Sequence, residues 1–531
     1  MAHLSTKLSL LGLSFLLGAV IVNVSYNVAT AAGFGDAATN RPGAVVAPRG
    51  LYGGVGVNAT LRSFGSVFRC DGVSDDTQAF LIAANRASTT GATVQLPSGT
   101  CMVSSVDLTG LQAYAIAGNG SGNGSTATTL MLTGADSSAC SAGKNGGLLF
   151  GKNTGYIQLR DLNISYNNRG RDCLINISHT QGDGFDPARI FIERVVFTGA
   201  VAGATTKAIF YDNAIEQLLE DSSFVAGKFQ WNVFQPATSG GDYFVNNTFN
   251  RNQFGANITP ANFQVVLGTG VVNLTFSGNN FENGPNGVDC SAASALGVNF
   301  FGNIFEDALS TSTGTWIKCT LSGSTIAGNQ IFGAEKGIVL TGGSGNKISG
   351  GWIGGSGAVG IQDEGWGNSI ESIHFGGSEA PGALDILEQG AGAHLGVNSY
   401  GSDNGVVTNS IELNEGSSGF IDYSSQNDSS RNGILNLTNP NAWQIRALGT
   451  DGGASILGAS AVASDYFPAV IYTAAGTPVP ACDAANNHRS ICTSDDRFAC
   501  SNGTAYRPGG QTACRVYCAT GIGWLATGSG C

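Results

Sequence analysis

Along most of this chain, two large apolar residues stand five positions apart, separated by a short polar stretch that often contains Gly and Asn. In Val272–Asn283 the two residues are Phe276 and Phe281, and the arrangement returns with Phe300 and Phe305. The first residue of each pair follows the previous one by 22 to 33 positions. The other pairs are Leu159/Ile164, Ile192/Phe197, Leu219/Phe224, Phe244/Phe249, Ile326/Ile331, Ile348/Ile353, Ile370/Phe375 and Leu395/Tyr400.

This recurrence predicts a solenoid. A short strand, a tight turn and a second short strand that return at such a period are typical of proteins built from stacked coils. A single coil cannot bury its own apolar face, so neighbouring coils must stack into a continuous core. We therefore expect an all-β, single-stranded parallel solenoid over residues 61–465.

Residues 61–132 predict a cap for the open end of this solenoid. Asp75 is a favourable helix N-cap, and Gln78 three positions later completes a capping-box pattern. Apolar residues then follow at helical spacing, and Gly91 is expected to end the helix. Thr93–Thr100 reads as a strand that runs into a turn. A helix laid across the first coil would close the solenoid.

Three motifs in this region carry a resemblance to a known family. They are Phe64-Gly65, Asp71-Gly72-Val73-Ser74-Asp75-Asp76-Thr77 and Leu96-Pro97-Ser98-Gly99-Thr100. Together they resemble the start of the pectate-lyase-like β-helix superfamily, most closely the rhamnogalacturonase/epimerase-like pectate lyase domain that also occurs in tailspike depolymerases. The motifs cover 61–132, and the coil pattern extends the likeness to about residue 400.

The resemblance implies a right-handed parallel β-helix that acts on polysaccharide. It also implies that the aspartates of the second motif cap the helix and form turns. The chain lacks the Asn-Thr-Asp, Gly-Asp-Asp and Arg-x-Lys motifs of polygalacturonase-type hydrolases. The Arg-centred set of calcium pectate lyases has no matching residues either, so no family catalytic residue can be transferred.

Equivalent positions on stacked coils form columns whose members lie about 4.7–4.9 Å apart. The third position after the first apolar residue holds Asn247, Asn279, Asn303 and Asn329. We expect these side chains to satisfy backbone groups in the turn.

Glu282 and Glu306 directly follow the second apolar residue on neighbouring coils, and the preceding coil places Asn250 there. Two carboxylates one coil apart repel each other. Their expected separation is close to the roughly 5–5.5 Å of retaining glycosidase pairs. One could donate a proton while the other acts as nucleophile. These two residues are the predicted catalytic pair.

Two alternatives stay open for this pair. Asp289 and Asp307 lie near enough in sequence to complete a Ca²⁺ site with the two glutamates. The four side chains could also be ordinary solvated surface or turn residues. Apart from this calcium alternative, we expect no cofactor.

Charged residues fill two further columns: Arg160, Glu193 and Glu220, followed one position later by Asp161, Arg194 and Asp221. Opposite charges alternate within and between coils, which favours a salt-bridge ladder. The alternative is an acidic site at Glu193 and Glu220, with Arg160 and Arg194 placed to bind a sugar carboxylate.

The longest connection between coils carries His179, Asp183 and Asp186 in a Gly-rich stretch. Such loops often form the rim of a groove, so the two aspartates belong to the alternative acidic site. A solvated turn is the other interpretation. Trp231 and Tyr243 could stack on sugar rings, although packing in the core could equally explain this aromatic group.

The chain ends indicate export. Residues 1–31 read as a signal peptide, because Lys7 precedes an apolar run of about fifteen residues and Ala29-Thr30-Ala31 offers a cleavage site. This run is shorter than the roughly 20 residues of a membrane span; an uncleaved anchor is the alternative. Residues 32–60 form a lead-in, 466–481 a linker and 482–531 a Cys-rich module that would depend on disulfides.

Twelve cysteines fit an exported protein, where disulfides persist. Cys70/Cys101, Cys140/Cys173 and Cys290/Cys319 each lie about one coil apart and could join neighbouring coils. A structural zinc site is not expected, because no Cys-x-x-Cys occurs. The net charge of −12 argues against nucleic acid or an anionic membrane as partner.

These observations predict a secreted protein, extracellular, periplasmic or on the cell surface, that processes a polysaccharide bound along the solenoid. Hydrolysis would use Glu282 and Glu306. A lyase would need a base for the sugar C5 proton and a cation or Arg for the resulting enediolate. The alternative is a non-catalytic glycan-binding or adhesion protein. A tailspike-like depolymerase is a weaker alternative, because a signal peptide argues against it.

Overall fold

The computed structural model describes residues 68–122, 124, 126–133, 139–166, 172–180, 184–198, 207–224, 229–236, 244–255, 262–284, 286–306, 314–376, 383–400, 411–414 and 417–423, with isolated strands in the remainder. The chain divides into two compact units. The first comprises 1–204 and 212–223, and the second 205–211 and 224–531. The predicted signal peptide lies outside the described residues. No helix in the described part of the chain is long and apolar enough to cross a membrane.

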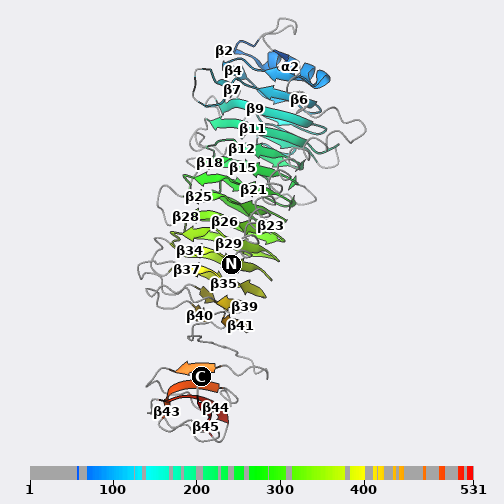
Figure 1. The fold of residues 1–531 in the computed structure, drawn as a ribbon. Coiled ribbons are helices and arrows are strands. Elements are labelled where there is room, and N and C mark those ends of the chain that lie inside the picture. Colours follow the sequence, from blue (N-terminus) through cyan, green and yellow to red (C-terminus); the bar gives the residue numbers. More distant parts are fainter. Residues whose placement is uncertain are drawn as a thin grey trace, which may run out of the picture. The chain divides into compact units, whose positions relative to one another are not determined.

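The first unit contains one helix, which follows β1 and β2 in the chain, and a series of parallel strands (Figure 1). Its strands are β1 (Val57–Asn58), β2 (Asp71–Asp75), β3 (Thr93–Gln95), β4 (Gly99–Val103), β5 (Val106–Asp107), β6 (Gln112–Ala117), β7 (Thr128–Leu132), β8 (Leu148–Phe150), β9 (Gly155–Tyr166), β10 (Cys173–Ser178), β11 (Ala188–Thr198), β13 (Ala214–Ile215) and β14 (Leu218–Glu220). Strands of successive coils pair in parallel: Ile116 aligns with Leu159, Leu159 with Ile192 and Ile192 with Leu219.

The predicted helix is α2, which spans Thr77–Thr90 and ends at Gly91 in the left-handed conformation (φ 67°), as expected. Its N-cap is Asp76 rather than Asp75, and no side chain caps it. Asp75 instead accepts hydrogen bonds from the backbone N–H and hydroxyl of Thr77. Gln78 is exposed and does not close the capping box, so that part of the prediction is wrong.

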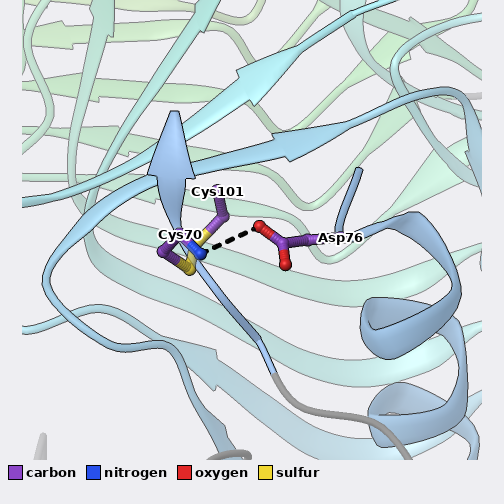
Figure 2. A group of neighbouring side chains, drawn as sticks. All are labelled: Cys70, Asp76 and Cys101. Atoms are coloured by element: carbon purple, nitrogen blue, oxygen red, sulfur yellow. Dashed lines mark hydrogen bonds between the residues drawn. A yellow bond between two sulfur atoms is a disulfide. The ribbon is translucent and has the colours of Figure 1, made fainter. Parts of the chain in front are cut away.

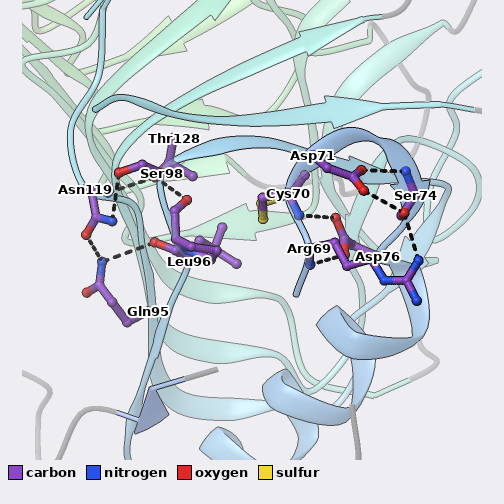
Figure 3. Close-up of a disulfide and its surroundings, with 12 residues drawn as sticks. Arg69, Cys70, Asp71, Ser74, Asp76, Gln95, Leu96, Ser98, Asn119 and Thr128 are labelled. Carbon is purple, nitrogen blue, oxygen red and sulfur yellow. Dashed lines mark hydrogen bonds between the residues drawn. A yellow bond between two sulfur atoms is a disulfide. The ribbon is translucent and has the colours of Figure 1, made fainter. Parts of the chain in front are cut away.

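Aspartates of the N-terminal motif accept hydrogen bonds from nearby backbone N–H groups, in the structural role that the resemblance implied (Figure 3). Asp76 is buried and accepts hydrogen bonds from the backbone N–H groups of Arg69 and Cys70. Asp71 accepts from the backbone N–H of Val73 and Ser74. These N–H groups lower the pKa of Asp71 to about 2.

The second unit is a parallel β-helix in which each complete coil contributes three strand runs. The run that carries the first apolar residue contains β17 (Thr248–Asn250), β21 (Thr275–Ser277), β24 (Asn299–Phe301), β27 (Thr325–Ala327), β30 (Lys347–Ser349), β33 (Ser369–Glu371), β36 (Ala393–Leu395), β39 (Ser418–Tyr423) and β41 (Ala442–Ala447). Short β16 (Phe244–Val245) and β20 (Val271–Val272) precede the first two of these strands.

The second apolar residue lies in a separate seven-stranded sheet, whose members follow one another along the unit (Figure 1). They are β18 (Gln253–Gly255), β22 (Asn280–Glu282), β25 (Ile304–Glu306), β28 (Gln330–Phe332), β31 (Trp352–Gly354), β34 (His374–Phe375) and β37 (Ser399–Tyr400). The third run contains β12 (Lys207–Asp212), β15 (Trp231–Phe234), β19 (Val265–Val266), β23 (Val288–Leu296), β26 (Thr315–Ser322), β29 (Lys336–Ser344), β32 (Val359–Asp363), β35 (Leu384–Glu388), β38 (Ile411–Leu413) and β40 (Leu435–Leu437).

The predicted apolar residues form the core of the second unit in continuous, buried columns. Phe276 aligns with Phe300, and their rings stack with centroids 4.8 Å apart. Phe281 aligns with Phe305 at 4.6 Å. A fully buried Phe contributes roughly 1.5–3 kcal/mol of burial free energy, so stacked columns supply the core that one coil lacks.

One predicted pair is displaced by five residues. Phe249 aligns with Phe276 and Phe254 with Phe281, so the pair of that coil is Phe249/Phe254 rather than Phe244/Phe249. Phe244 belongs to β16 and aligns with Val271. All three phenylalanines are buried and five apart, so the spacing rule accepts either choice.

The Asn column exists, but it starts at Asn252 instead of Asn247. The backbone N–H and side-chain amide of Asn252 both donate to Oδ1 of Asn279, and the same bonds link Asn279 to Asn303 and Asn303 to Asn329. The amides also donate to backbone carbonyls, as from Asn303 to Phe276 at 3.1 Å. The column therefore satisfies the backbone of the tight turn internally.

Three predicted disulfides are present: Cys70–Cys101, Cys140–Cys173 and Cys290–Cys319. Cys290 and Cys319 are aligned neighbours on β23 and β26, so their bond joins consecutive coils. The described residues contain no free cysteine. Three disulfides indicate an oxidising, extracytoplasmic compartment.

A four-stranded sheet follows in the C-terminal region: β42 (Val470–Thr473), β43 (Ser490–Asp496), β44 (Thr512–Ala519) and β45 (Gly523–Ser529). β42 pairs with β43 in parallel, and the other pairs are antiparallel. The sheet therefore begins within the stretch 466–481. The side chains of the six C-terminal cysteines lie outside the described residues.

Candidate functional site

The outer face of the seven-stranded sheet is the candidate site. In a strand, successive side chains point to opposite faces. Phe281, Phe305, Ile331 and Ile353 are buried at the centre of their short strands, and Phe375 is buried at the end of β34. The residues on either side of each one therefore face outward, and they form two columns along the sheet.

Glu282 and Glu306 are aligned neighbours in one of these columns, as the sequence predicted. Glu282 is half-buried and Glu306 is exposed, so both carboxyls lie outside the core. The residue aligned before Glu282 is Gly255 rather than Asn250, because of the five-residue displacement. Neither Gly255 nor the next column residue, Phe332, can neutralise the pair.

Asn280 binds both carboxyls. Its side-chain amide donates to Oε2 of Glu282 at 3.3 Å and to Oε1 of Glu306 at 3.4 Å. Gln253 donates a second hydrogen bond to Glu282, at 2.7 Å to Oε1. One amide therefore reaches both carboxyls, which lie on neighbouring strands. Such closeness fits the roughly 5–5.5 Å between the carboxyls of retaining glycosidases better than the roughly 6.5–9.5 Å of inverting ones.

Aromatic residues continue the same face, and the sequence analysis did not select them. Phe332 follows Glu306 in the first column, while Trp352 and His374 are aligned in the second. The Trp352 ring lies 4.6 Å from the Phe332 ring, edge to face, and 6.3 Å from the His374 ring. Reading the residue before each second apolar residue, as well as the one after it, would have found them.

The calcium alternative gains no third ligand among the described residues. Asp289 is on β23 in another sheet, where its carboxylate accepts hydrogen bonds from the backbone N–H and hydroxyl of Ser291. Asp307 lies outside the described residues. The one group of three potential ligands in the described residues is Cys70, Asp76 and Cys101, but its two sulfurs form a disulfide (Figure 2).

The charged columns in the first unit are in the predicted register. Glu193 aligns with Arg160 on one side and Glu220 on the other. Arg194 binds the Asp161 carboxylate through two nitrogens, at 2.6 and 3.0 Å, and Arg160 binds the same carboxylate at 2.7 Å. Burial raises the pKa of Asp161, but the two guanidinium groups outweigh it and hold that pKa below its usual value. Both predicted substrate-binding arginines are therefore engaged in a salt-bridge network.

The remaining predicted residues make contacts of their own. Buried His179 lies 3.3 Å from the Asp186 carboxylate, and burial raises the pKa of Asp186 although the His179 charge lowers it. Half-buried Trp231 packs against Phe234 at 4.9 Å and under the Lys207 ammonium. Asp183 and Tyr243 lie outside the described residues.

Two carboxyls that the sequence analysis passed over are completely buried. Asp363 and Glu388 are aligned neighbours at the ends of β32 and β35, and neither is exposed. Asp363 accepts hydrogen bonds from the Gly365 backbone and the Asn368 amide, and Glu388 accepts one from the Gly390 backbone. The apolar residues Leu340 and Leu413 occupy the same column, so these acids face the core.

No protein-family model matches the sequence, and no curated protein matches it. The fold is structurally similar to known β-helix proteins. The A-module of mannuronan C-5 epimerase AlgE6 from Azotobacter vinelandii is 17% identical, with a TM-score of 0.44 over 74% of this chain and 100% of that one. PfbA, a surface adhesin of Streptococcus pneumoniae, is 13% identical (TM-score 0.41; 74% and 91% covered). The Dettilon tailspike protein is 14% identical, with a TM-score of 0.43 over 72% of this chain and 68% of that one. Such distant likenesses carry no argument about activity.

Proposed function

We propose that this chain is an exported polysaccharide-processing protein, and specifically a glycoside hydrolase that uses Glu282 and Glu306. The observation that carries the proposal is the register of the two carboxyls on the outer face of the seven-stranded sheet. They are aligned, accessible and bridged by one amide, and their column neighbours are uncharged. Repulsion between them has no evident structural benefit, which favours a chemical role.

The contacts suggest a division of roles. Glu282 accepts amide hydrogen bonds from both Gln253 and Asn280, and this fixed orientation suits a nucleophile. Its carboxylate would attack the anomeric carbon while the glycosidic C–O bond breaks. Exposed Glu306 would give its proton to the leaving oxygen and then accept one from the water that hydrolyses the glycosyl ester, releasing Glu282.

Lyase chemistry is the alternative enzymatic reading. It requires a base together with a cation or Arg near the sugar carboxylate. Arg160 and Arg194 are the predicted candidates, and the Asp161 carboxylate already binds both. A non-catalytic glycan-binding or adhesion protein remains the second candidate function, since the same outer face could hold a glycan without cleaving it.

The test is incubation of the purified mature chain with a panel of neutral and acidic polysaccharides. A hydrolase releases new reducing ends, a lyase also creates an ultraviolet-absorbing unsaturated sugar, and a binder does neither. Glu282→Gln and Glu306→Gln should each reduce hydrolysis by several orders of magnitude, whereas Glu364→Gln, an exposed control, should not. Azide should restore turnover to Glu282→Ala by replacing the nucleophile. Unchanged activity in either Gln variant would refute the pair.

The same proposal includes export, a right-handed coil and polysaccharide as the partner rather than nucleic acid. Three disulfides support export, and the net charge of −12 argues against nucleic acid as the partner. N-terminal sequencing of the exported chain would test the expected cleavage after residue 31. A chain that retains residues 1–31 would favour the membrane-anchored alternative.

A further inference from the structure

The outer face of the seven-stranded sheet changes character along the unit. After the carboxyls of Glu282 and Glu306 come three aromatic side chains, Phe332, Trp352 and His374, which we call the aromatic platform. Trp352 is the central member, with Phe332 on one side and His374 on the other. Its side chain keeps 38% of its surface exposed, which is uncommon for so large an apolar group.

The Trp352 indole is held in a fixed position. Its Nε1 donates a hydrogen bond to the backbone carbonyl of Gly376 at 2.9 Å. A Cβ atom built on Gly354 would lie 3.4 Å from this nitrogen, so the indole reaches across Gly354. Gly354 is aligned with Phe332 in the column that contains the two glutamates. The indole therefore continues the row formed by Glu282, Glu306 and Phe332.

We propose that Trp352 and Phe332 bind a pyranose ring of a neutral glycan by stacking, and that the glycan runs along the row to the Glu pair. The inference rests on the proposed function and names its substrate class. The row spans two coils between Glu306 and the indole, or about 10 Å. An aromatic face complements the apolar C–H face of a sugar, and a side chain already fixed by a hydrogen bond loses little entropy on binding.

Charge decides between neutral and acidic glycans. The seven strands of this sheet contain no Lys or Arg in their described residues, whereas two carboxyls face outward on it. A polyuronate laid along the row would bring its own carboxylates against Glu282 and Glu306, with no cation on the sheet to compensate. The row thus favours neutral hexose, pentose or N-acetylhexosamine units. It disfavours the uronates on which a lyase acts.

The experiment measures binding by isothermal titration with the full mature wild-type chain, because the charge argument needs both carboxylates. Every probe is S-linked, which glycosidases cleave very slowly, so the ligand stays intact. The probes are neutral hexasaccharides of glucose, xylose, mannose and N-acetylglucosamine, with hexagalacturonate as the acidic probe. At least one neutral probe should bind more tightly than hexagalacturonate. Adding Trp352→Ala should weaken that binding roughly tenfold or more, and Trp352→Phe should recover part of it.

Trp366→Ala is the matched control, because Trp366 is 66% exposed but lies outside the seven-stranded sheet. Its affinity should be unchanged. Equal losses from both Trp variants, tighter binding of hexagalacturonate, or no binding of any neutral probe would overturn the inference. Binding that depends on Trp352, in a wild-type chain that cleaves nothing, would keep this inference and reject the catalytic proposal. Hydrolysis that is insensitive to Trp352→Ala would keep the catalytic proposal and reject the stacking role of Trp352.

Discussion

The buried acid pair Asp363 and Glu388 makes a quantitative prediction about stability and pH. Oδ2 of Asp363 and Oε2 of Glu388 have no donor among the described groups, although both residues are fully buried. The two residues are aligned neighbours on β32 and β35, so a single proton held between the two carboxyls would supply the missing donor. Burial raises the pKa of Asp363, and burial together with the neighbouring Asp363 carboxyl raises that of Glu388 well above its usual value.

The sign follows from proton uptake on folding. In the unfolded chain, Asp and Glu release their protons near pKa values of about 3.9 and 4.3. The folded pair keeps one proton up to its raised pKa, so in this window the folded state binds more protons. The free energy of unfolding then falls by about 1.4 kcal/mol per pH unit for each extra proton. The stability that this retained proton gives to the folded state is fully present below about pH 4, and it is lost as the pH rises through the raised pKa of the pair.

Glu388→Gln isolates this effect. The amide oxygen can still accept the Gly390 N–H, and the amide nitrogen can donate to Asp363, so no proton is needed. Relative to wild type, the variant should therefore gain about 1.4 kcal/mol per pH unit within the window. Denaturant unfolding from pH 5 to 9, followed by Trp fluorescence, measures the difference.

The control is Glu335→Gln, because Glu335 is exposed in the same unit and is not among the charges that raise the pKa of Asp363 or Glu388; it should leave the pH slope unchanged. Parallel pH profiles for Glu388→Gln and wild type would show that the pair shares no proton and would refute the reasoning. As a separate check, Glu388→Ala removes the acceptor of the Gly390 N–H and leaves a cavity. At pH 5, the low end of this range, it should lower stability by roughly 2–4 kcal/mol.

Two other predictions concern the columns. Asn303→Ala removes the acceptor of two Asn279 N–H groups and the donor to the Phe276 carbonyl. It should therefore lower the free energy of unfolding, measured in urea, by roughly 2–4 kcal/mol. A loss below about 0.5 kcal/mol would contradict a structural role for the Asn column. Arg194→Ala removes a half-exposed salt bridge to Asp161, so we expect a loss of no more than about 1 kcal/mol that shrinks at high salt. Glycan binding should be unaffected, and weaker binding would instead favour the substrate-binding role of this arginine.

The candidate site was partly predictable. The register of Glu282 and Glu306 follows from their position after an inward-facing Phe, since a strand alternates its faces with a period of two. Gln253 and Asn280 could not be assigned to the pair, because their contacts depend on side-chain conformation. The aromatic platform was missed for another reason. Trp352 belongs to a different column of the sheet, and only its side-chain conformation, with the indole hydrogen-bonded to the Gly376 carbonyl, brings the ring against Phe332.

The stacked coils and the inward-facing columns follow from the spacing of apolar residues along one coil, and the same spacing made three disulfides between neighbouring coils possible; the fold shows that all three form. Tertiary structure alone decided between Phe244 and Phe254 as the partner of Phe249, because all three fit the spacing and only strand pairing distinguishes them. It also decided that Asp363 and Glu388 are buried. Leu340 and Leu413 occupy the same column, but polarity alone places acids at the surface. The groups that donate hydrogen bonds to the buried carboxyls, Gly365, Asn368 and Gly390, come together only in the fold.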